Sequence, residues 1–255
     1  MILIIDIFQT VTIILVCTLL FLGFKFFEST WSYKISKPNK WESSVFKNDV
    51  SSKLKKIERT YRDRVRFYNF WFQVDRLKRD NVEGAFVELG VYQGETAVIL
   101  HEMDNTRDLH LFDTFEGFVE EDLKVEKNRD DRYTVSNFSD TQLDTVKALF
   151  KDSSNVFYYK GYFPDTTVDL KETKFALVNI DADLYKPTIA ALNYFYPKLS
   201  PGGVLIIHDY NHTWDGAKQA IDEFIVTIPE CLIEIPDWQG SAMIIKNKKT
   251  LDIRH

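Results

Sequence analysis

Cysteine is scarce in this chain of 255 residues, which has only Cys17 and Cys231. One lies inside an apolar run and the other inside a strand-like stretch, so a disulfide framework and a thiolate metal cluster are both excluded. A reducing compartment fits this usage. With 45% hydrophobic and 27% charged residues, the chain is long enough to bury one substantial core, and we expect one globular domain.

An excess of positive charge is also missing. The chain has 32 Lys and Arg residues against 38 Asp and Glu, a formal net charge of -6 at pH 7. A nucleic-acid binder needs a basic face to hold phosphates, so nucleic acid is excluded as a partner. The sequence does not indicate an oligomeric state, and a homodimer is compatible with it.

The run from Ile7 to Phe24 contains no charged residue. As a helix it would be roughly 27 Å long, close to the hydrocarbon thickness of a bilayer at about 30 Å. A cleaved signal peptide is disfavoured, because no Lys or Arg precedes the run and no small-x-small site follows it. A buried helix is the remaining alternative. The lysines downstream of the run predict a single-pass anchor over residues 1–27, with the remainder in the cytoplasm.

Residues 28–49 show no apolar periodicity and are interpreted as a juxtamembrane linker, followed by a globular domain over residues 50–255. At the start of this domain, apolar residues recur at steps of three and four, which predicts one amphipathic helix. Its apolar positions are Val50, Leu54, Ile57, Tyr61, Val65, Tyr68 and Phe72. Such a helix either packs on the core, which is the commoner use, or covers a binding site as a lid.

Beyond Asn81 short apolar runs alternate with helical stretches, the rhythm of a parallel α/β sheet. Strands are predicted at residues 85–89, 109–112, 156–159, 175–180, 204–207, 231–235 and 242–246. Helices are predicted at residues 95–103, 141–150, 187–199 and 216–226. The last two strands are too close for a crossover helix, so they should pair as an antiparallel hairpin at the sheet edge.

A glycine-containing turn follows the first predicted strand, in Phe86-Val87-Glu88-Leu89-Gly90-Val91-Tyr92-Gln93-Gly94. Gly90 and Gly94 permit a tight turn, so a ligand can lie over the strand end at the helix N-terminus. Tyr92 stands where a dinucleotide fingerprint needs its second glycine, which disfavours a pyrophosphate. An ordinary strand-to-helix turn is the alternative.

An acid follows the second predicted strand, in Leu109-His110-Leu111-Phe112-Asp113. A carboxylate at this place can accept hydrogen bonds from ribose hydroxyls, as in many nucleoside-binding sheets. A helix cap or a turn residue would explain Asp113 equally well on its own. Its spacing from Gly90 favours the ribose interpretation.

Acids also end the fourth and fifth predicted strands, where Asp181, Asp183 and Asp209 follow uniformly apolar runs. Neighbouring strands lie about 4.8 Å apart, so Asp181 and Asp209 can converge on one divalent cation. Asp183, two residues past Asp181, would point the same way on an extended chain and accept a proton from a substrate hydroxyl. Solvated loop acids are the alternative.

These segments resemble the macrocin O-methyltransferase family of class I methyltransferases. The resemblance covers about Tyr61 to Lys246 and is carried by VELGVYQGETA, LHLFDTFEGF, VNIDADLYKPTIAALNYFYPKLSPGGVLIIHDYNH and GAKQAIDEF. It implies a Rossmann-like fold and an S-adenosyl-L-methionine site at Glu88, Gly90, Gly94 and Asp113. It further implies a magnesium-dependent transfer to a hydroxyl, typically of a sugar, with Asp181 and Asp209 as metal ligands and Asp183 as the base.

The chain departs from the family at His208, where two adjacent acids are usual. An imidazole is a less natural magnesium ligand than a carboxylate, so His208 favours Mn²⁺ or another transition metal, weakens the site or stands outside the shell. His212 and Trp214 follow as candidates for an acceptor site or as plain loop residues. The charged stretch from Glu116 to Arg132 either covers the crevice or is solvated, and its composition favours solvation.

The leading interpretation is therefore a membrane-anchored O-methyltransferase with a small-molecule or glycan acceptor. A metal-dependent hydroxylase-like relative on the same scaffold is a second possibility. A third is a non-catalytic, membrane-tethered binding domain, because a fold does not fix a function. The sequence does not identify the acceptor.

Overall fold

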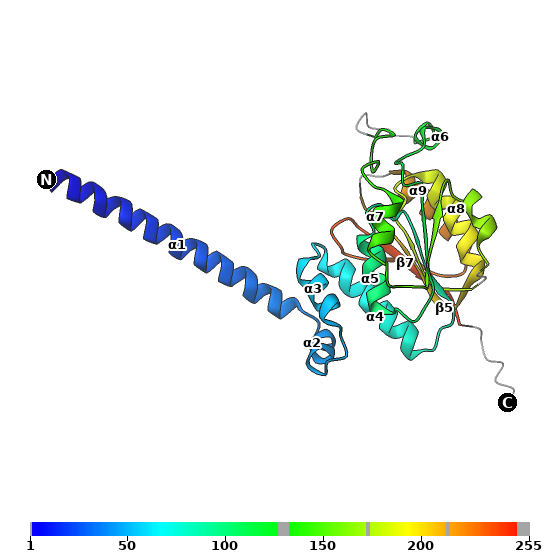
Figure 1. The fold of residues 1–255 in the computed structure, drawn as a ribbon, viewed down its shortest axis with the longest axis horizontal. Helices are drawn as coiled ribbons and strands as arrows, with labels where there is room; N and C mark the ends of the chain where they lie inside the picture. The colour runs from blue at the N-terminus through cyan, green and yellow to red at the C-terminus, as the bar shows by residue number, and fades with distance from the viewer. Residues whose placement is uncertain (1, 127–132, 172–173, 213–214, 249–255) are drawn as a thin grey trace. The chain divides into compact units, whose positions relative to one another are not determined.

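The structure is a computed structural model that describes residues 2–126, 133–171, 174–212 and 215–248. The chain divides into two compact units, Met1–Ser51 and Ser52–His255. Each unit is described by itself below. Figure 1 gives the order of the elements along the chain.

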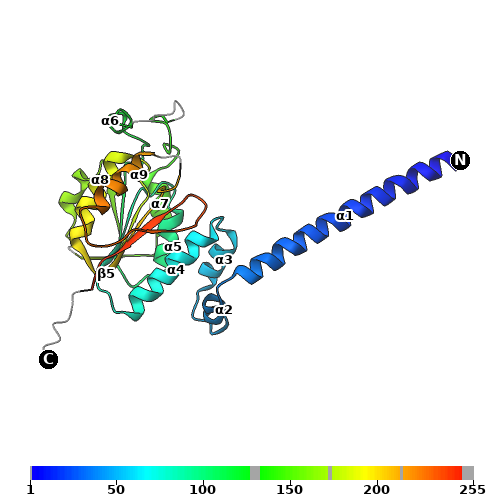
Figure 2. The same ribbon diagram turned by 180° about the vertical axis from the view of Figure 1, so that it is seen from behind.

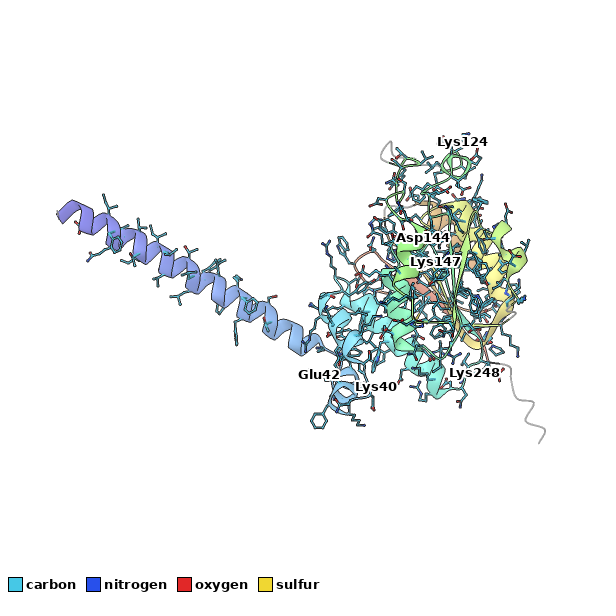
Figure 3. All side chains as sticks on the ribbon, viewed as in Figure 1. Lys40, Glu42, Lys124, Asp144, Lys147 and Lys248 are labelled. Carbon is cyan, nitrogen blue, oxygen red and sulfur yellow. The ribbon has the colours of Figure 1, made fainter. Side chains whose placement is uncertain are left out.

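The first unit consists of α1 (Ile2–Ser36) and α2 (Asn39–Phe46). Within α1, the stretch Asp6–Thr30 is long and apolar enough to cross a membrane, and none of it is buried in the described chain (Figure 3). The helix continues into the range predicted as a linker because no proline interrupts it before Pro38. Lys37 precedes that proline and is therefore disfavoured in a helix, so α1 ends at Ser36.

The polar groups of the apolar stretch are satisfied within the helix. The hydroxyls of Thr10, Thr12 and Thr18 each donate to the carbonyl four residues earlier, at 2.7–2.8 Å. Lys25 pairs with Glu28 at 2.8 Å, one turn further on. A helix that is apolar on all sides, with its hydroxyls bonded to its own backbone, suits a hydrocarbon environment.

The second unit is built on a seven-stranded sheet with the order β3-β2-β1-β4-β5-β7-β6. The strands are β1 (Ala85–Leu89), β2 (Leu109–Asp113), β3 (Val156–Lys160), β4 (Phe175–Ile180), β5 (Leu199–Ile207), β6 (Ile233–Glu234) and β7 (Ala242–Ile245). The first five pair in parallel, whereas β7 is antiparallel to both β5 and β6. The predicted fold class, with its C-terminal antiparallel hairpin, is confirmed.

Helices cover both faces of this sheet. They are α3 (Ser52–Thr60), α4 (Arg64–Arg79), α5 (Glu95–Met103), α6 (Glu120–Leu123), α7 (Leu143–Ala148), α8 (Tyr185–Phe195) and α9 (Asp215–Ile225), with the 3-10 helices η1 (Asp165–Asp169) and η2 (Tyr196–Lys198). Figure 1 and Figure 2 show α8 and α9 on one face and α4 and α5 on the other. Because β1 and β4 are buried along their whole length, ligands can reach them only at their ends. The strand order reverses between β1 and β4, which opens a crevice at their carboxyl ends.

The single amphipathic helix predicted from Val50 to Phe72 is wrong. The chain forms two helices there, α3 and α4, because the Asp63 carboxylate accepts a hydrogen bond from the Arg66 backbone N–H at 2.9 Å and starts α4 anew. The new start shifts the buried face, so Val65 is 46% exposed whereas Phe67 is fully buried. Part of the predicted apolar stripe therefore faces solvent.

The prolines explain the other shifted boundaries. Pro187 is tolerated in the first turn of a helix, so α8 begins at Tyr185, before the predicted start. Tyr196 still has a helical backbone conformation, but Pro197 has no backbone N–H to donate to the α-helical ladder, so α8 ends at Phe195 and the 3-10 helix η2 follows. The strand β5 begins at Leu199, and Gly202, at φ 83°, lies in the stretch where its register with β4 shifts.

We predict that the full chain stays with the membrane pellet through alkaline carbonate extraction, because α1 buries its apolar surface in lipid. A fragment lacking residues 1–27 should stay in the supernatant and keep a cooperative unfolding transition. The measurement is sedimentation followed by immunoblotting, with circular dichroism of the fragment. A full chain released by carbonate would contradict the anchor.

Candidate active site

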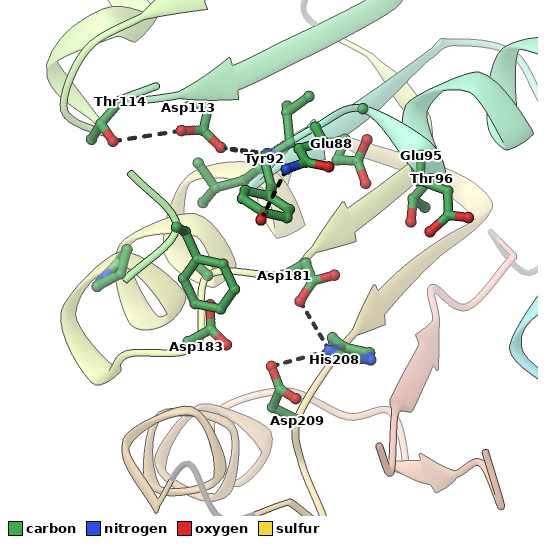
Figure 4. Close-up of a pocket in the computed structure, with 18 of the residues that line it drawn as sticks. Glu88, Tyr92, Glu95, Thr96, Asp113, Thr114, Asp181, Asp183, His208 and Asp209 are labelled. Carbon is green, nitrogen blue, oxygen red and sulfur yellow. Dashed lines mark hydrogen bonds and ion pairs between the residues drawn. The ribbon is translucent and has the colours of Figure 1, made fainter. Parts of the chain in front are cut away.

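A pocket of about 870 Å³ lies at the carboxyl ends of the parallel strands (Figure 4). The strand ends contribute Glu88, Asp113, Asp181, His208 and Asp209 to its lining. The remaining walls come from the turn between α3 and α4, from the segments 117–122 and 161–163, and from Trp238 and Gln239. The predicted site residues are thus brought together in one pocket.

Both glycines after β1 have left-handed backbone conformations, at φ 86° for Gly90 and φ 82° for Gly94. A Cβ on Gly90 would lie 1.9 Å from the carbonyl oxygen of Asp181, so no other residue fits there. A Cβ on Gly94 would instead approach Leu149 at 3.0 Å and Val146 at 3.3 Å, beside α7. Both glycines line the pocket, but their Cβ positions point at the protein, so close packing as well as ligand approach demands them.

Asp113 fixes the loop that follows β1. Its Oδ2 atom accepts hydrogen bonds from the backbone N–H groups of Val91 at 2.7 Å and Tyr92 at 2.8 Å. Its Oδ1 atom accepts one from the backbone N–H of Phe115 at 2.6 Å. The carboxylate therefore holds the Gly90 loop in shape while it lines the pocket, which agrees with the turn interpretation, and the ribose interpretation stays a prediction.

Glu88 is buried at the end of β1. Its Oε1 atom accepts a hydrogen bond from the Asn179 side-chain amide at 3.1 Å, and its Oε2 atom has no hydrogen-bond partner among the described residues. Burial, reinforced by the charge of Asp181, raises the pKa of Glu88 well above its usual value, although Arg66 opposes this. A protonated Glu88 can donate a hydrogen bond into the pocket.

The ends of β4 and β5 bring Asp181, His208 and Asp209 together. The two strands are neighbours in register, with Ile180 opposite Ile207. The Nδ1 atom of His208 lies 2.9 Å from Asp181 Oδ1 and 3.0 Å from Asp209 Oδ2 (Figure 4). On its other side Asp181 Oδ2 forms an ion pair with Arg66 Nη2 at 2.7 Å.

The neighbouring cations set the charge of this cluster. Burial would raise the pKa of Asp181, but His208 and Arg66 outweigh it and hold that pKa well below its usual range. Burial and Arg66 would lower the pKa of His208, but Asp181 and Asp209 raise it to about 9. The imidazole is therefore protonated at neutral pH unless a metal ion takes the place of its proton.

The donor set fits a divalent cation. One ligand atom from each of Asp181, His208 and Asp209 lies within 4.8 Å of the other two. Ligand atoms bound at about 2.1 Å and at right angles stand about 3.0 Å apart, which matches the two distances at His208 Nδ1. Both carboxylate oxygens of Asp209 are buried, and Oδ2 lies 3.0 Å from His208 Nδ1, so these oxygens can serve as ligands of an ion.

Asp183 lines the same pocket, but the predicted reason is wrong. The backbone at Asp183 is left-handed, at φ 58°, so the chain is not extended there and simple alternation does not apply. The side chain lies on the same side of the pocket as Asp209 in Figure 4. Burial, with the charges of Asp209 and Asp181, raises its pKa well above the usual value.

The more distant candidates gave mixed outcomes. His212 is exposed on its loop and its Nδ1 lies 3.9 Å from Asp209 Oδ1, whereas Trp214 lies outside the described residues. In the charged stretch, residues 127–132 are also outside the described chain. Phe118, Val119 and Asp122 line the pocket, so this part of the stretch is not simply solvated.

The pocket residues that the sequence interpretation missed include Tyr61, Arg66 and Trp238. Arg66 carried a detectable signal, since it lies four residues before the buried Phe70 and so on the inner face of α4. Tyr61 was read as one more position of an apolar stripe. Trp238 has no local pattern, because its place depends on the turn between β6 and β7.

The sheet order and the glycine loop at the end of β1 define a class I methyltransferase. The chain belongs to the macrocin O-methyltransferase (TylF) family, whose model matches residues 46–243. The resemblance found in the sequence is confirmed.

Two curated relatives carry sugar-related names. The 8-demethyl-8-(2,3-dimethoxy-alpha-L-rhamnosyl)-tetracenomycin-C 4'-O-methyltransferase of Streptomyces olivaceus is 28% identical over 62% of this chain and 64% of its own length. The mycinamicin III 3''-O-methyltransferase of Micromonospora griseorubida is 30% identical over 62% of this chain and 67% of its own length. The chain thus matches about two thirds of their length. The solved structure of the O-methyltransferase NovP shares the fold, with a TM-score of 0.63 and 24% identity over 72% of this chain and 81% of that one.

We predict a pH-dependent stability effect of Glu88→Gln. A carboxyl whose folded pKa is raised contributes stability that is present below its unfolded value, 4.5, and is lost as the pH rises through the folded pKa. From about pH 5 to about pH 8, the wild type should lose free energy of unfolding relative to Glu88→Gln, by at most about 1.4 kcal/mol per pH unit.

Urea unfolding at several pH values measures this difference. The variant Glu83→Gln, whose side chain is 81% exposed, is the matched control. Parallel pH profiles for the wild type and Glu88→Gln would show that Glu88 is an ordinary carboxylate.

Proposed function

We propose that this protein is an S-adenosyl-L-methionine-dependent O-methyltransferase that methylates a hydroxyl of a sugar or glycan. One observation carries the proposal: the Gly90 loop and the cluster of Asp181, His208 and Asp209 open into the same pocket. A methyl donor and an acceptor hydroxyl have to meet in one place, which this arrangement provides. Family membership and the names of the two curated relatives support the sugar acceptor.

The cofactor end of the pocket is formed by Glu88, Gly90, Gly94 and Asp113. Asp113 keeps the loop after β1 in place and presents its carboxylate to ribose hydroxyls. The backbone N–H groups at the start of α5 can bind a negatively charged group of the cofactor, because helix N-termini bind anions. Glu88, protonated by its burial, adds a donor at the end of β1.

The acceptor end of the pocket is formed by Asp181, His208, Asp209 and Asp183. When bound, S-adenosyl-L-methionine supplies an electrophilic methyl group, and a divalent cation held by Asp181, Asp209 and His208 supplies a Lewis acid. His208 replaces the acid usual in the family, so the site should prefer Mn²⁺ or another transition metal over Mg²⁺. Arg66 holds Asp181 from the other side and fixes its direction.

Asp183 is the residue that accepts the proton of the acceptor hydroxyl. Burial and the charges of Asp209 and Asp181 raise the pKa of Asp183, so its ionised form is a stronger base than an exposed aspartate. A cation held by Asp181 and Asp209 would offset their charges and favour that ionised form. Its backbone is left-handed two residues before α8, and its side chain lies beside Asp209 in the pocket (Figure 4).

The location follows from α1. We propose a single-pass anchor with the methyltransferase unit in the cytoplasm, because the lysines lie on the C-terminal side of the apolar stretch. A hydroxylase-like reaction and a non-catalytic binding role remain the competing functions. Neither of these functions would produce a cellular glycan that is heavier by one methyl group.

We predict that Asp113→Ala weakens binding of S-adenosylhomocysteine roughly 10- to 100-fold, the loss expected for a hydrogen bond to a charged group. Calorimetry on the full chain measures it. Mass spectrometry of glycan and lipid extracts should then show a product one methyl group heavier in cells with the wild type and not in cells with Asp113→Ala.

The control is Asp144→Ala, whose side chain is 95% exposed on α7. It should match the wild type in both measurements. Equal affinity of Asp113→Ala and the wild type would overturn the cofactor assignment, and equal masses with intact cofactor binding would overturn the methyl transfer.

The metal ligands and the base should fail differently when they are mutated. Asp181→Asn and Asp209→Asn should weaken Mn²⁺ binding about tenfold or more, with activity partly restored by added metal. Asp183→Asn should bind metal normally and stay inactive. His208→Asp should shift the preference toward Mg²⁺.

Direct Mn²⁺ titration, followed by electron paramagnetic resonance, reads metal binding without an activity assay. If the wild type retains no Mn²⁺ and a chelator leaves its turnover unchanged, the cation does not belong to the reaction. The strand-end acids would then have a structural role.

A further inference from the structure

The outward face of α3 carries unpaired positive charge. Its inner face packs on the protein, since Leu54 is buried and Lys53 pairs with Glu102 on α5 at 2.8 Å. Lys56 and Arg59 are exposed and Lys55 is half-buried, and Arg62 follows, exposed, in the turn before α4. We call these four side chains, Lys55, Lys56, Arg59 and Arg62, the cationic face.

Contacts among the described residues do not explain the cationic face. Within residues 2–126 and the other described ranges, none of its four side chains forms an ion pair or a hydrogen bond. The chain as a whole has a net charge of -6, so these cations stand out against an acidic background. Four like charges within about two helical turns repel one another, and an external anionic partner would relieve that repulsion.

The cationic face borders the mouth of the pocket. Arg62 lines the pocket, together with Ile57 and Thr60 of α3. Trp238 lines it too and is 81% exposed. The Asp63 carboxylate joins the two segments, because its Oδ2 atom accepts a hydrogen bond from the Trp238 backbone N–H at 2.8 Å. An exposed tryptophan therefore stands beside a row of cations at one rim.

We propose that the cationic face and Trp238 dock on the anionic headgroups of the membrane that α1 crosses. Lysine and arginine next to a membrane span bind anionic lipids, and tryptophan is enriched at the interface between headgroups and hydrocarbon. Only residues 31–51 separate the apolar stretch Asp6–Thr30 from α3, so the chain tethers the unit that carries this face to the membrane. A single phosphate would contact one or two of the cations, whereas a bilayer surface contacts all four.

Docking in this way turns the pocket mouth toward the bilayer. An acceptor would then enter from the headgroup layer, which selects a glycan carried on a lipid over a free soluble sugar. This consequence rests on the proposed methyl transfer, whereas the docking itself rests only on the proposed membrane anchor.

The test reconstitutes the full chain in nanodiscs of phosphatidylcholine alone or with about one third phosphatidylglycerol. Since α1 is inserted in both, only the headgroup charge differs. Acetylation of each lysine by a water-soluble ester is followed by mass spectrometry. Lys55 and Lys56 should react about threefold or more slowly in the anionic discs, and about 0.5 M NaCl should remove the difference by screening.

Lys124 and Lys147, which Figure 3 labels near α6 and on α7, report on other surfaces and should react equally in both discs. The variant Arg59→Glu should lose the protection of Lys55 and Lys56. Its matched control, Arg79→Glu, changes an exposed arginine on α4 and should keep it.

Equal reaction of Lys55 and Lys56 in the two kinds of disc overturns the docking. Protection by soluble pyrophosphate with none by phosphatidylglycerol also overturns it, because the face would then hold a free anion. Binding of S-adenosylhomocysteine, measured in the same discs, separates the two proposals. Lysine protection without cofactor binding refutes the methyltransferase function and leaves the docking standing.

Discussion

The carboxylate of Asp181 is the point on which the pocket is assembled. One of its oxygens binds Arg66 of α4 at 2.7 Å, and the other lies 2.9 Å from His208 at the end of β5. Its backbone carbonyl is also the atom that excludes a side chain at Gly90. A buried charge is tolerated only where opposite charges and hydrogen bonds surround it, so α4 and the end of β5 have to stay in contact with Asp181. The constraint that stabilises Asp181 therefore also brings together the Gly90 loop and the cluster of Asp181, His208 and Asp209.

Most of the fold could be predicted because the information is local. Each parallel strand is a short apolar run followed by a helix, and the short link between the last two strands leaves only an antiparallel pairing. The strand-end acids were found for the same reason, since Asp113, Asp181 and Asp209 sit where parallel sheets bind ligands. The errors occurred where a side chain overrides periodicity. Asp63 caps a new helix inside what looked like one continuous amphipathic stripe, and a period of 3.6 residues cannot reveal that change of direction.

The rest of the site depends on tertiary contacts that have no sequence signature. Arg66 lies on the inner face of α4, but its charge is tolerated there because it pairs with Asp181, 115 residues further along the chain, and the sequence does not show that pairing. Asp183 reaches the pocket through a left-handed backbone, not through the alternation of an extended chain. Trp238 takes its place from a hydrogen bond to Asp63 across the fold. Sequence reasoning found the groups at the ends of strands and missed Arg66 of α4 and Trp238 of the β6–β7 turn.

The two ends of the pocket differ in how strongly the sheet determines their structure. The proposed cofactor end is built from β1 and β2, and Asp113 accepts hydrogen bonds from three backbone N–H groups, two of them in the loop after β1, so this end should vary little within the fold. The acceptor end is walled by the α3–α4 turn, the segment 117–122 and the β6–β7 turn, which belong to no strand. Loops of this kind change more readily than the sheet beneath them, which is how one fold comes to serve many acceptors. In the proposed function these three walls would recognise the acceptor, and two of them meet at Asp63, beside the cationic face.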